Sequence, residues 1–356
     1  MGDQQLDHYP LVAISILTWN GWRDTVQCLE STRKLDYPNY LTVAVDNGST
    51  NGSADRIKDW ACENLGPGGA IVDYPDEVAL RGGEEDSEAA LDQAAPLNRL
   101  VLIRNRSNRG FSGGHNVAMH YALTRKRAAD DVLLLNNDVT ISPDAVNRLL
   151  LVQQSSNAGI VGASQILKEN PPRTVGWPAS FHASFFSPFI RDSADPPKSK
   201  ELYWPTDLIS GTAMLMRRDV LTEVGGSSGE YLCSKLFFSG PESFCFAAKR
   251  RNYGVVIAKD VVVEHLGGRS GGGKGSPLKY YYEQRDLVLR ARMMLPFHYR
   301  MLFYLLNLSR AAGSAAKNLM RRQPRAAWAM LQGVLDGYRG RGGKWKHHDR
   351  EAPARE

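Results

Sequence analysis

The chain has 356 residues, 42% of them hydrophobic and 23% charged, a composition typical of a globular protein with one or two domains. Its four cysteines form no CxxC pair, which argues against a zinc site or a disulfide framework and favours a reducing compartment. No apolar run approaches the roughly 20 residues that span a bilayer, and the N-terminus has no basic segment, so we expect a cytoplasmic protein.

The first half of the chain alternates segments typical of buried strands with segments of helical spacing. Apolar runs that end in polar turns predict strands at residues 11–19, 40–50, 99–105 and 131–138. Apolar residues at helical spacing predict helices between them, at residues 22–35, 53–65 and 113–126. This βαβαβαβ order favours an α/β fold with a mainly parallel sheet and right-handed crossovers.

Two stretches lack this pattern. Residues 66–98 are rich in Gly, Pro and acids, and we predict a solvated surface insertion without a role in chemistry. Residues 170–205 combine prolines with aromatics. Aromatic side chains in such a loop stack on sugar rings in some proteins and anchor the loop to its own core in most.

The formal charge of +6 is spread unevenly, because basic residues crowd the chain from Arg290 onward. Residues 301–322 and 326–338 resemble two helices with apolar stripes and basic flanks. Such helices lie on an anionic membrane surface or pack on the protein's own core, and the sequence favours neither. Only the basic tail would suggest a nucleic-acid partner, so we do not expect one.

Polar, turn-forming residues follow each predicted strand. They are Thr18 to Asn20 after the first, Asp46 to Ser49 after the second, Asn105 to Gly114 after the third and Asn136 to Asp138 after the fourth. Because open parallel sheets bind ligands at the carboxyl ends of their strands, these residues together outline a polar cleft. The glycine-rich run 108–116 offers backbone N–H groups to an anion, but it matches neither a Walker loop nor GxGxxG.

Several motifs stand in the order found in family 2 glycosyltransferases: ISILTWNG, VAVDNGSTNGS, NRGFSGGHN, LLLNNDV, SGTAMLMRRDVLTEVGG and VVVEHLGGRSGG, followed by YYYEQRD. Over residues 10–292 the chain resembles the rhamnosyltransferase-like branch of that family. The resemblance implies a GT-A fold in residues 1–292, with a Rossmann-like, mostly parallel central sheet flanked by helices. It divides this domain into a nucleotide-binding half, about 10–140, and an acceptor-binding half, about 141–292. An amphipathic helical extension at 293–340 and a basic, disordered tail at 341–356 are expected to follow.

The resemblance also implies which residues bind the nucleotide sugar. Asp46 would accept a hydrogen bond from the N3–H of a uracil or thymine ring. The other residues that the family pattern places around the nucleotide are Thr18, Asn20, Asn108, Arg109, Gly110 and Asn116.

Residues 136–138, Asn-Asn-Asp, fall on the family motif that holds a divalent metal, with Asp138 as its acid. Mg²⁺ or Mn²⁺ is often bound through one or two carboxylates plus substrate phosphates, so one acid suffices. His265 resembles the family's histidine and would be a further metal or phosphate ligand, although a histidine that caps a strand end explains it as well. Asn136 and Asn137 would orient the sugar or a metal-bound water.

The acceptor hydroxyl needs a base, which the family supplies from an acidic motif before a helix. That segment reads GPES here, so we predict Glu242 as the base, with Glu230 upstream as the alternative. Arg285 follows a Gly/Ser-rich loop and would contact a phosphate together with Ser270 and Lys274. An ion pair between Arg285 and a nearby acid is equally compatible with the sequence.

The sequence thus predicts an inverting glycosyltransferase that moves rhamnose or a similar hexose from a UDP- or dTDP-sugar to a hydroxyl of a polysaccharide or lipid-linked oligosaccharide. A polyprenyl-linked acceptor would bring the protein to the inner face of the cell membrane, where a basic C-terminus suits an anionic surface. The altered base motif leaves open a relative that binds nucleotide sugar or glycan without transfer. A sugar-phosphate nucleotidyltransferase is disfavoured, because no Gly-rich loop with Arg or Lys follows the first strand.

Overall fold

The computed structural model describes residue 6 and residues 8–167, 173–175, 178–180, 191–192, 200–226, 229–265 and 276–348. Its first half contains β1 (Val12–Thr18), α1 (Trp22–Thr32), β2 (Tyr40–Asp46), α2 (Ser53–Asn64), β3 (Ala70–Pro75), α3 (Asp76–Ala79), α4 (Glu85–Gln93), η1 (Pro96–Asn98), β4 (Arg99–Arg104), α5 (Gly110–Thr124) and β5 (Asp131–Asn136). The predicted strands are β1, β2, β4 and β5, and the predicted helices are α1, α2 and α5, so the alternation read from the sequence is confirmed.

The second half completes the sheet and adds helices. It contains β6 (Val139–Thr140), α6 (Ala145–Ser156), β7 (Ala158–Leu167), β8 (Arg173–Val175), β9 (Ala179–Ser180), β10 (Arg191–Asp192), β11 (Tyr203–Pro205), β12 (Ala213–Arg217), α7 (Arg218–Gly225), α8 (Pro241–Lys249), β13 (Gly254–His265), α9 (Pro277–Met294), α10 (Phe297–Met320) and α11 (Pro324–Tyr338). Most of the Pro-rich and aromatic stretch 170–205 lies outside the described residues, so a role of its aromatics in sugar stacking stays a prediction.

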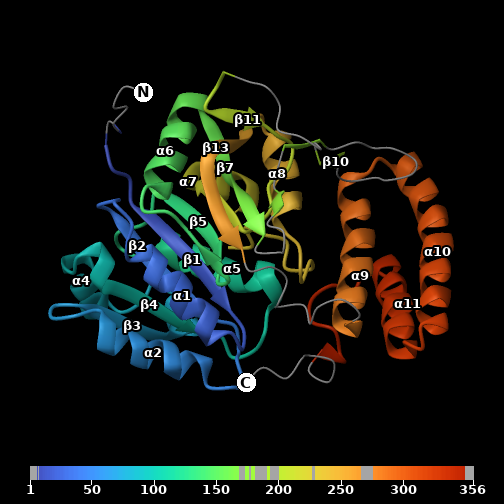
Figure 1. The fold of residues 1–356 in the computed structure, drawn as a ribbon, viewed down its shortest axis with the longest axis horizontal. Coiled ribbons are helices and arrows are strands. Elements are labelled where there is room, and N and C mark those ends of the chain that lie inside the picture. The colour runs from blue at the N-terminus through green and yellow to red at the C-terminus, as the bar shows by residue number, and fades with distance from the viewer. Residues whose placement is uncertain are drawn as a thin grey trace.

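One large sheet carries the part of the fold that the structure describes. Its strand order is β11-β13-β7-β12-β5-β1-β2-β4-β3, and β6 and β8 pair with β13 and β7. β3, β4, β2, β1 and β5 are parallel neighbours, whereas β12 lies antiparallel between β5 and β7. Every residue of β2 is buried, because helices cover both faces of the sheet (Figure 1). Successive residues such as Val12 and Ala13 therefore enter two different apolar cores, one on each face.

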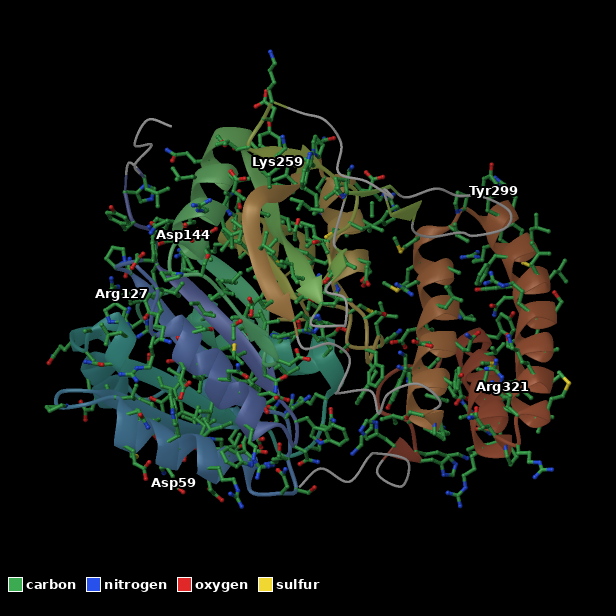
Figure 2. The ribbon with its side chains drawn as sticks, viewed as in Figure 1. Asp59, Arg127, Asp144, Lys259, Tyr299 and Arg321 are labelled. Carbon is green, nitrogen blue, oxygen red and sulfur yellow. The ribbon has the colours of Figure 1, made fainter. Side chains whose placement is uncertain are left out.

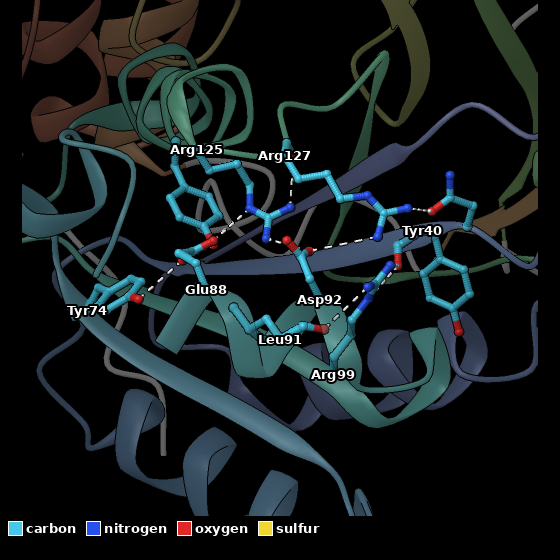
Figure 3. Close-up of polar contacts among 10 residues, drawn as sticks. Tyr40, Tyr74, Glu88, Leu91, Asp92, Arg99, Arg125 and Arg127 are labelled. Atoms are coloured by element: carbon cyan, nitrogen blue, oxygen red, sulfur yellow. Dashed lines mark hydrogen bonds and ion pairs between the residues drawn. The ribbon is translucent and has the colours of Figure 1, made fainter. Parts of the chain in front are cut away.

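The insertion at residues 66–98 is part of the domain, so the prediction of a solvated surface loop was wrong. β3 extends the parallel sheet beyond β4, and Leu91 is fully buried. Figure 3 shows Glu88 bonded to Arg125 after α5, with 2.7 Å between Oε2 and Nε, and Asp92 on the same guanidinium at 2.8 Å. The insertion is rich in acids, but the basic partner of two of them, Arg125, lies outside it. The composition of the insertion alone therefore suggested that these acids are exposed to solvent.

The C-terminal helices α9, α10 and α11 stand together beside the sheet domain (Figure 1). The extension predicted from residue 293 therefore packs with α9, which begins at Pro277. α11 approaches α9 closely, since a Cβ at Gly333 would lie 2.3 Å from the carbonyl oxygen of Tyr281. Figure 2 shows Tyr299 and Arg321 near the two ends of α10. No helix in the described ranges is both long and apolar enough to cross a membrane.

Residues 341–348 return from α11 to the sheet domain, where the sequence predicted the start of a disordered tail. Trp345 and His348 are buried, with 3% and 1% of their surface exposed. Trp345 stacks on Tyr281 with ring centroids 4.3 Å apart. Aromatic side chains packed on α9 thus hold this part of the basic segment, and residues 349–356 lie outside the described residues.

Candidate functional site at the carboxyl edge of the sheet

The carboxyl ends of β1, β2 and β5 meet at one edge of the sheet. Thr18 pairs with Asp46 in the register of β1 and β2, and Leu17 pairs with Asn136 in that of β1 and β5. A cavity of about 290 Å³ opens at this edge. Its walls come from strand ends, loops, α9 and the C-terminal segment: Leu17, Thr18, Trp19, Asn47, Asn108, Gly110, Phe111, Asn136, Asn137, Asp138, Phe237, Phe238, His265, Lys279, Glu283 and His348. The polar cleft predicted from the strand ends is therefore present.

Asp46 ends β2 with a buried carboxylate and does not itself line the cavity, although its neighbour Asn47 does. Its Oδ2 accepts a hydrogen bond from the backbone N–H of Ser49 at 3.1 Å, and its Oδ1 has no hydrogen-bond partner among the described residues. Burial raises the pKa of this carboxyl group, and the hydrogen bonds from Ser49, which lower the pKa, offset this only in part. Because a buried acceptor without a donor costs about 1–3 kcal/mol, Oδ1 is suited to receive an N–H from a ligand.

Asn20 shapes the turn beside Asp46 and is not part of the cavity wall. Its backbone is left-handed, with φ of 53°, a conformation that asparagine tolerates. Its N–H donates to the hydroxyl of Ser49 at 2.8 Å, and its side-chain oxygen accepts from the N–H of Thr50 at 2.8 Å. Asn20 therefore acts on Asp46 through the loop that follows β2.

Asn47 holds the glycine-rich loop in place. Its amide donates to Oδ1 of Asn108 at 3.0 Å and to the carbonyl of Gly110 at 3.1 Å, while its Oδ1 accepts from the N–H of Arg109 at 3.1 Å. Gly110 has φ of 72°, and a Cβ there would lie 2.6 Å from the carbonyl oxygen of Phe237. Asn108 and Gly110 line the cavity, and their predicted contact with a nucleotide stays a prediction.

Two other predicted donor-site residues direct their side chains away from the cavity. The guanidinium of Arg109 pairs with Asp76 of α3. The side-chain amide of Asn116 donates to the carbonyl of Leu232 at 2.7 Å and accepts from its N–H at 2.8 Å. Neither side chain lines the cavity, so in this structure both position the loop and α5.

Arg285 is buried within α9. Its Nε and Nη2 lie 3.0 and 2.8 Å from Oδ1 of Asp286, and its Nη1 donates to the carbonyl of Gly343. Of the two roles that the sequence left open, the ion pair with a nearby acid is the one present here. Ser270 and Lys274, its predicted companions at a phosphate, lie outside the described residues.

Asp138 and His265 form a pair in the cavity wall, where β5 and β13 end. Nε2 of His265 lies 3.1 Å from Oδ1 of Asp138, and Nδ1 of His265 is buried without a hydrogen-bond partner among the described residues. One oxygen and one nitrogen donor fit Mg²⁺ or Mn²⁺ whose other positions are filled by phosphates and water. Within the described ranges, no group of three or more His, Cys, Asp or Glu side chains could hold a metal ion.

The two asparagines before Asp138 line the same wall. The amide of Asn137 donates to the hydroxyl of Thr25 at 3.1 Å and to the carbonyl of Gly21 at 3.3 Å, so it fixes the start of α1. The backbone N–H of Asn136 donates to the carbonyl of Thr212 at 3.0 Å. These bonds hold Asn136 and Asn137 between the start of α1 and the residue before β12.

Glu242 lies in the first turn of α8. Its Oε1 is 3.6 Å from Nη1 of Arg290 on α9, and its Oε2 is buried without a hydrogen-bond partner in the part of the chain that the structure describes. It does not line the cavity. The alternative base, Glu230, accepts from the N–H and the hydroxyl of Ser234 at 2.9 and 2.6 Å and lines a different cavity.

A family model described as glycosyltransferase like family 2 matches residues 74–286, more than half of the chain. The chain belongs to this family. The match contains Asp138, Glu242 and His265, and it confirms the resemblance that the sequence motifs suggested.

Two curated glycosyltransferases are similar to this family 2 member. Low-salt glycan biosynthesis hexosyltransferase Agl10 of Haloferax volcanii is 27% identical over 173 residues, which are 48% of this chain and 53% of that protein. Galactofuranosyltransferase GlfT2 of Mycolicibacterium smegmatis is 26% identical over 210 residues, which are 53% of this chain and 32% of that protein. The chain thus spans about half of the first relative and about a third of the second.

Two solved structures resemble most of this chain in fold, although their sequences are only distantly similar to it. Mannosyltransferase PcManGT from Pyrobaculum calidifontis, in complex with GDP-Man and Mn²⁺, gives a TM-score of 0.55 at 14% identity and covers 93% of this chain and 88% of its own. GalNAc-T7 with UDP, GalNAc and Mn²⁺ gives 0.54 at 11% identity and covers 84% of this chain and 54% of its own. The likeness concerns the fold alone, and it confirms the GT-A fold predicted for this family 2 member.

The sequence did not indicate that four residues of the cavity wall belong to the site. Phe237 precedes α8, Lys279 and Glu283 come from α9, and His348 comes from the segment after α11. Oε1 of Glu283 lies 3.7 Å from Nζ of Lys279, and burial raises the pKa of the Glu283 carboxyl group. A Lys and a Glu four residues apart occur on many helices, so only the position of α9 against the sheet brings this pair to the site.

Proposed function

We propose that this protein is an inverting glycosyltransferase that moves rhamnose or a similar hexose from a UDP- or dTDP-sugar to a hydroxyl group of a polysaccharide or lipid-linked oligosaccharide. The observation that carries the proposal is the cavity at the strand ends, with Asp138 and His265 in one wall and the Glu283 carboxylate in another. Family membership supports sugar transfer, and the names of Agl10 and GlfT2 support a hexose.

The nucleotide sugar would bind along the strand ends. Oδ1 of Asp46 accepts the N3–H of the base, and the Asn108 to Gly110 loop packs beside the nucleotide, with Thr18 in the same wall. Asp138 and His265 would hold Mg²⁺ or Mn²⁺, and the metal would offset the negative charge that grows on the departing diphosphate. The Mn²⁺ in the PcManGT and GalNAc-T7 structures supports this cofactor.

The acceptor hydroxyl would lose its proton to Glu242 at the start of α8. Its Oε2 has no hydrogen-bond partner among the described residues and would accept the proton, while Arg290 compensates the charge of its other oxygen. Glu283 is the second candidate, because it lines the cavity and Glu242 does not. Each side chain is a carboxylate on a helix of the proposed acceptor-binding half, so the two can be compared by matched substitutions.

A membrane-bound acceptor is supported by the outer surface of α10. This helix exposes an apolar stripe at helical spacing, and the exposed fractions are 68% for Phe297, 45% for Met301, 67% for Leu305 and 48% for Leu308. Exposed basic side chains follow at the turn into α11: Lys317, Arg321, Arg322 and Arg325. Apolar side chains beside bases suit an anionic membrane surface, so we place the protein at the inner face of the cell membrane, with a polyprenyl-linked acceptor.

A thermal-shift panel of UDP-, dTDP- and GDP-sugars, with and without Mn²⁺, tests the donor assignment. A donor at 100 times its Kd adds about 2.7 kcal/mol to the free energy of unfolding. Stabilisation by a uracil or thymine donor should require Mn²⁺ in the wild type, and Asp138→Asn should lose the effect of the metal. Stabilisation by GDP-sugars alone would refute the role of Asp46.

A protein that binds nucleotide sugar or glycan without transfer is the second candidate, and the altered GPES segment around Glu242 favours it. Release of UDP or dTDP in the presence of acceptors separates the two functions. If the wild type and Glu242→Gln bind the donor equally and neither consumes it, the protein is a binding protein and transfer is refuted.

A further inference from the structure

The segment after α11, residues 341–348, forms a wall of the cavity that no family motif covers. The backbone N–H of Trp345 donates to the hydroxyl of Tyr282 at 2.8 Å. The Trp345 ring also stacks on Tyr281, with an interplanar angle of 12°. These contacts fix the segment on α9 and bring His348 to the cavity.

His348 connects three parts of the cavity wall, with 1% of its surface exposed. Its Nδ1 lies 2.9 Å from the hydroxyl oxygen of Tyr282, and its Nε2 lies 3.5 Å from Nδ2 of Asn108. Its ring centroid is 5.0 Å from that of Trp19 and 5.1 Å from that of Phe237. One imidazole therefore joins the end of β1, the loop after β4 and the loop before α8.

The strand order assigns His348 to one end of the cavity. Trp19 follows β1 and Asn108 precedes α5 after β4, and β2, which ends in Asp46, lies between these two strands. Asp138 follows β5, on the opposite side of β1. His348 is thus on the side of Oδ1 of Asp46, which has no partner in the described part of the chain and where a nucleoside would bind, and away from the proposed metal pair.

We infer that His348 contacts the nucleoside of the bound nucleotide sugar, with Tyr282 and Trp345 as positioning residues. The inference rests on the proposed function. Trp19 and His348 offer flat rings with polar edges, which suit stacking and hydrogen bonding to a pyrimidine base or its ribose. The C-terminal segment is then part of the donor pocket.

Isothermal titration of UDP in Mn²⁺ into the full chain tests this inference. His348→Ala should weaken UDP binding about tenfold or more, the loss expected when an aromatic contact to a base is removed. The matched control is His347→Ala, because His347 contacts the rings of Trp328 and Trp345 and does not line the cavity. This control should bind UDP as the wild type does.

Tyr282→Phe keeps the ring and removes only the hydroxyl that holds His348, so it decides the question if His348→Ala does not fold. It should weaken UDP binding about threefold or more. Binding of Mn²⁺-pyrophosphate, which has no nucleoside, should stay unchanged in both variants. Unchanged or tighter UDP binding in the folded variants overturns the inference, as does a parallel loss for pyrophosphate. A wild type that binds neither UDP nor dTDP refutes the proposed function itself, before any variant is compared.

Discussion

Glu88 should be one of the most important side chains for the stability of the sheet domain, and its replacement by alanine tests this. Glu88 and Arg125 expose only 6% and 1% of their side chains, and Oε2 lies 2.7 Å from Nε (Figure 3). The other carboxylate oxygen accepts hydrogen bonds from the hydroxyls of Tyr121, at 2.8 Å, and Tyr74, at 3.2 Å. Glu88→Ala therefore leaves one buried cation and two hydroxyls without this partner.

The size of the effect follows from these contacts. Removing one member of a buried ion pair costs about 3–5 kcal/mol, because the remaining charge stays buried. Asp92 bonds the same guanidinium of Arg125 at 2.8 Å, but its side chain is 27% exposed, so it compensates only in part. An orphaned hydroxyl adds about 1–3 kcal/mol, and such contributions overlap within one network. We expect Glu88→Ala to lower the free energy of unfolding by about 3–5 kcal/mol.

Urea unfolding with linear extrapolation measures this loss. The matched control is Glu85→Ala on the same helix, α4, since Glu85 pairs with Lys126 at 3.0 Å while both side chains are about 80% exposed. The control should show no measurable change. A loss below about 1 kcal/mol for Glu88→Ala, the range of exposed pairs, would refute the reasoning.

Three further predictions concern catalysis, pH and the membrane. With UDP affinity unchanged, Glu242→Gln should lower kcat about 100-fold or more, and a larger loss in Glu283→Gln would assign the base to α9. Burial lowers the pKa of His115 to about 3, below its value of about 6.5 in the unfolded chain. The unfolded chain therefore binds a proton that the folded protein does not, so the contribution of His115 to the free energy of unfolding is present above about pH 6.5 and is lost as the pH falls. His115→Gln should remove a slope of about 1.4 kcal/mol per pH unit from urea stability curves between pH 6.5 and 4, and an unchanged slope would contradict this. Leu305→Glu with Leu308→Glu should reduce co-sedimentation with phosphatidylglycerol vesicles, and equal binding would argue against α10 as the membrane surface.

The sequence predicted β1, β2, β4 and β5 because these strands are buried on both faces and therefore read as continuous apolar runs. β3 reads differently, since it alternates buried and partly exposed residues at the outer edge of the sheet. Its neighbour α4 carries acids whose burial depends on Arg125, more than thirty residues later. Local composition cannot report a pairing at that separation, so the insertion was interpreted as solvated.

The same reasoning explains which site residues the sequence could predict. Thr18, Asp46 and Asn136 are the last residues of β1, β2 and β5, and parallel strands bring their carboxyl ends to one edge whatever the side chains are. Residue type alone does not say where a side chain points. Arg109 and Arg285 were predicted to bind the nucleotide sugar, yet their guanidinium groups lie against acids of α3 and α9.

Glu283 and His348 reach the cavity through the contact between α9 and α11, which helical spacing cannot predict. From the sequence alone, a glycine within a helix is expected to destabilise that helix by about 1 kcal/mol relative to alanine. Here Gly333 and Gly337 remove side chains where α11 meets α9: a Cβ would lie 2.3 Å from the Tyr281 carbonyl oxygen at the first and 2.7 Å from Cβ of Val288 at the second. Larger residues would push the helices apart and shift both the α9 wall and the segment after α11. The motifs at the strand ends thus form one side of the cavity, and two glycines remote from those motifs allow the close contact of α9 and α11 on which the opposite wall rests.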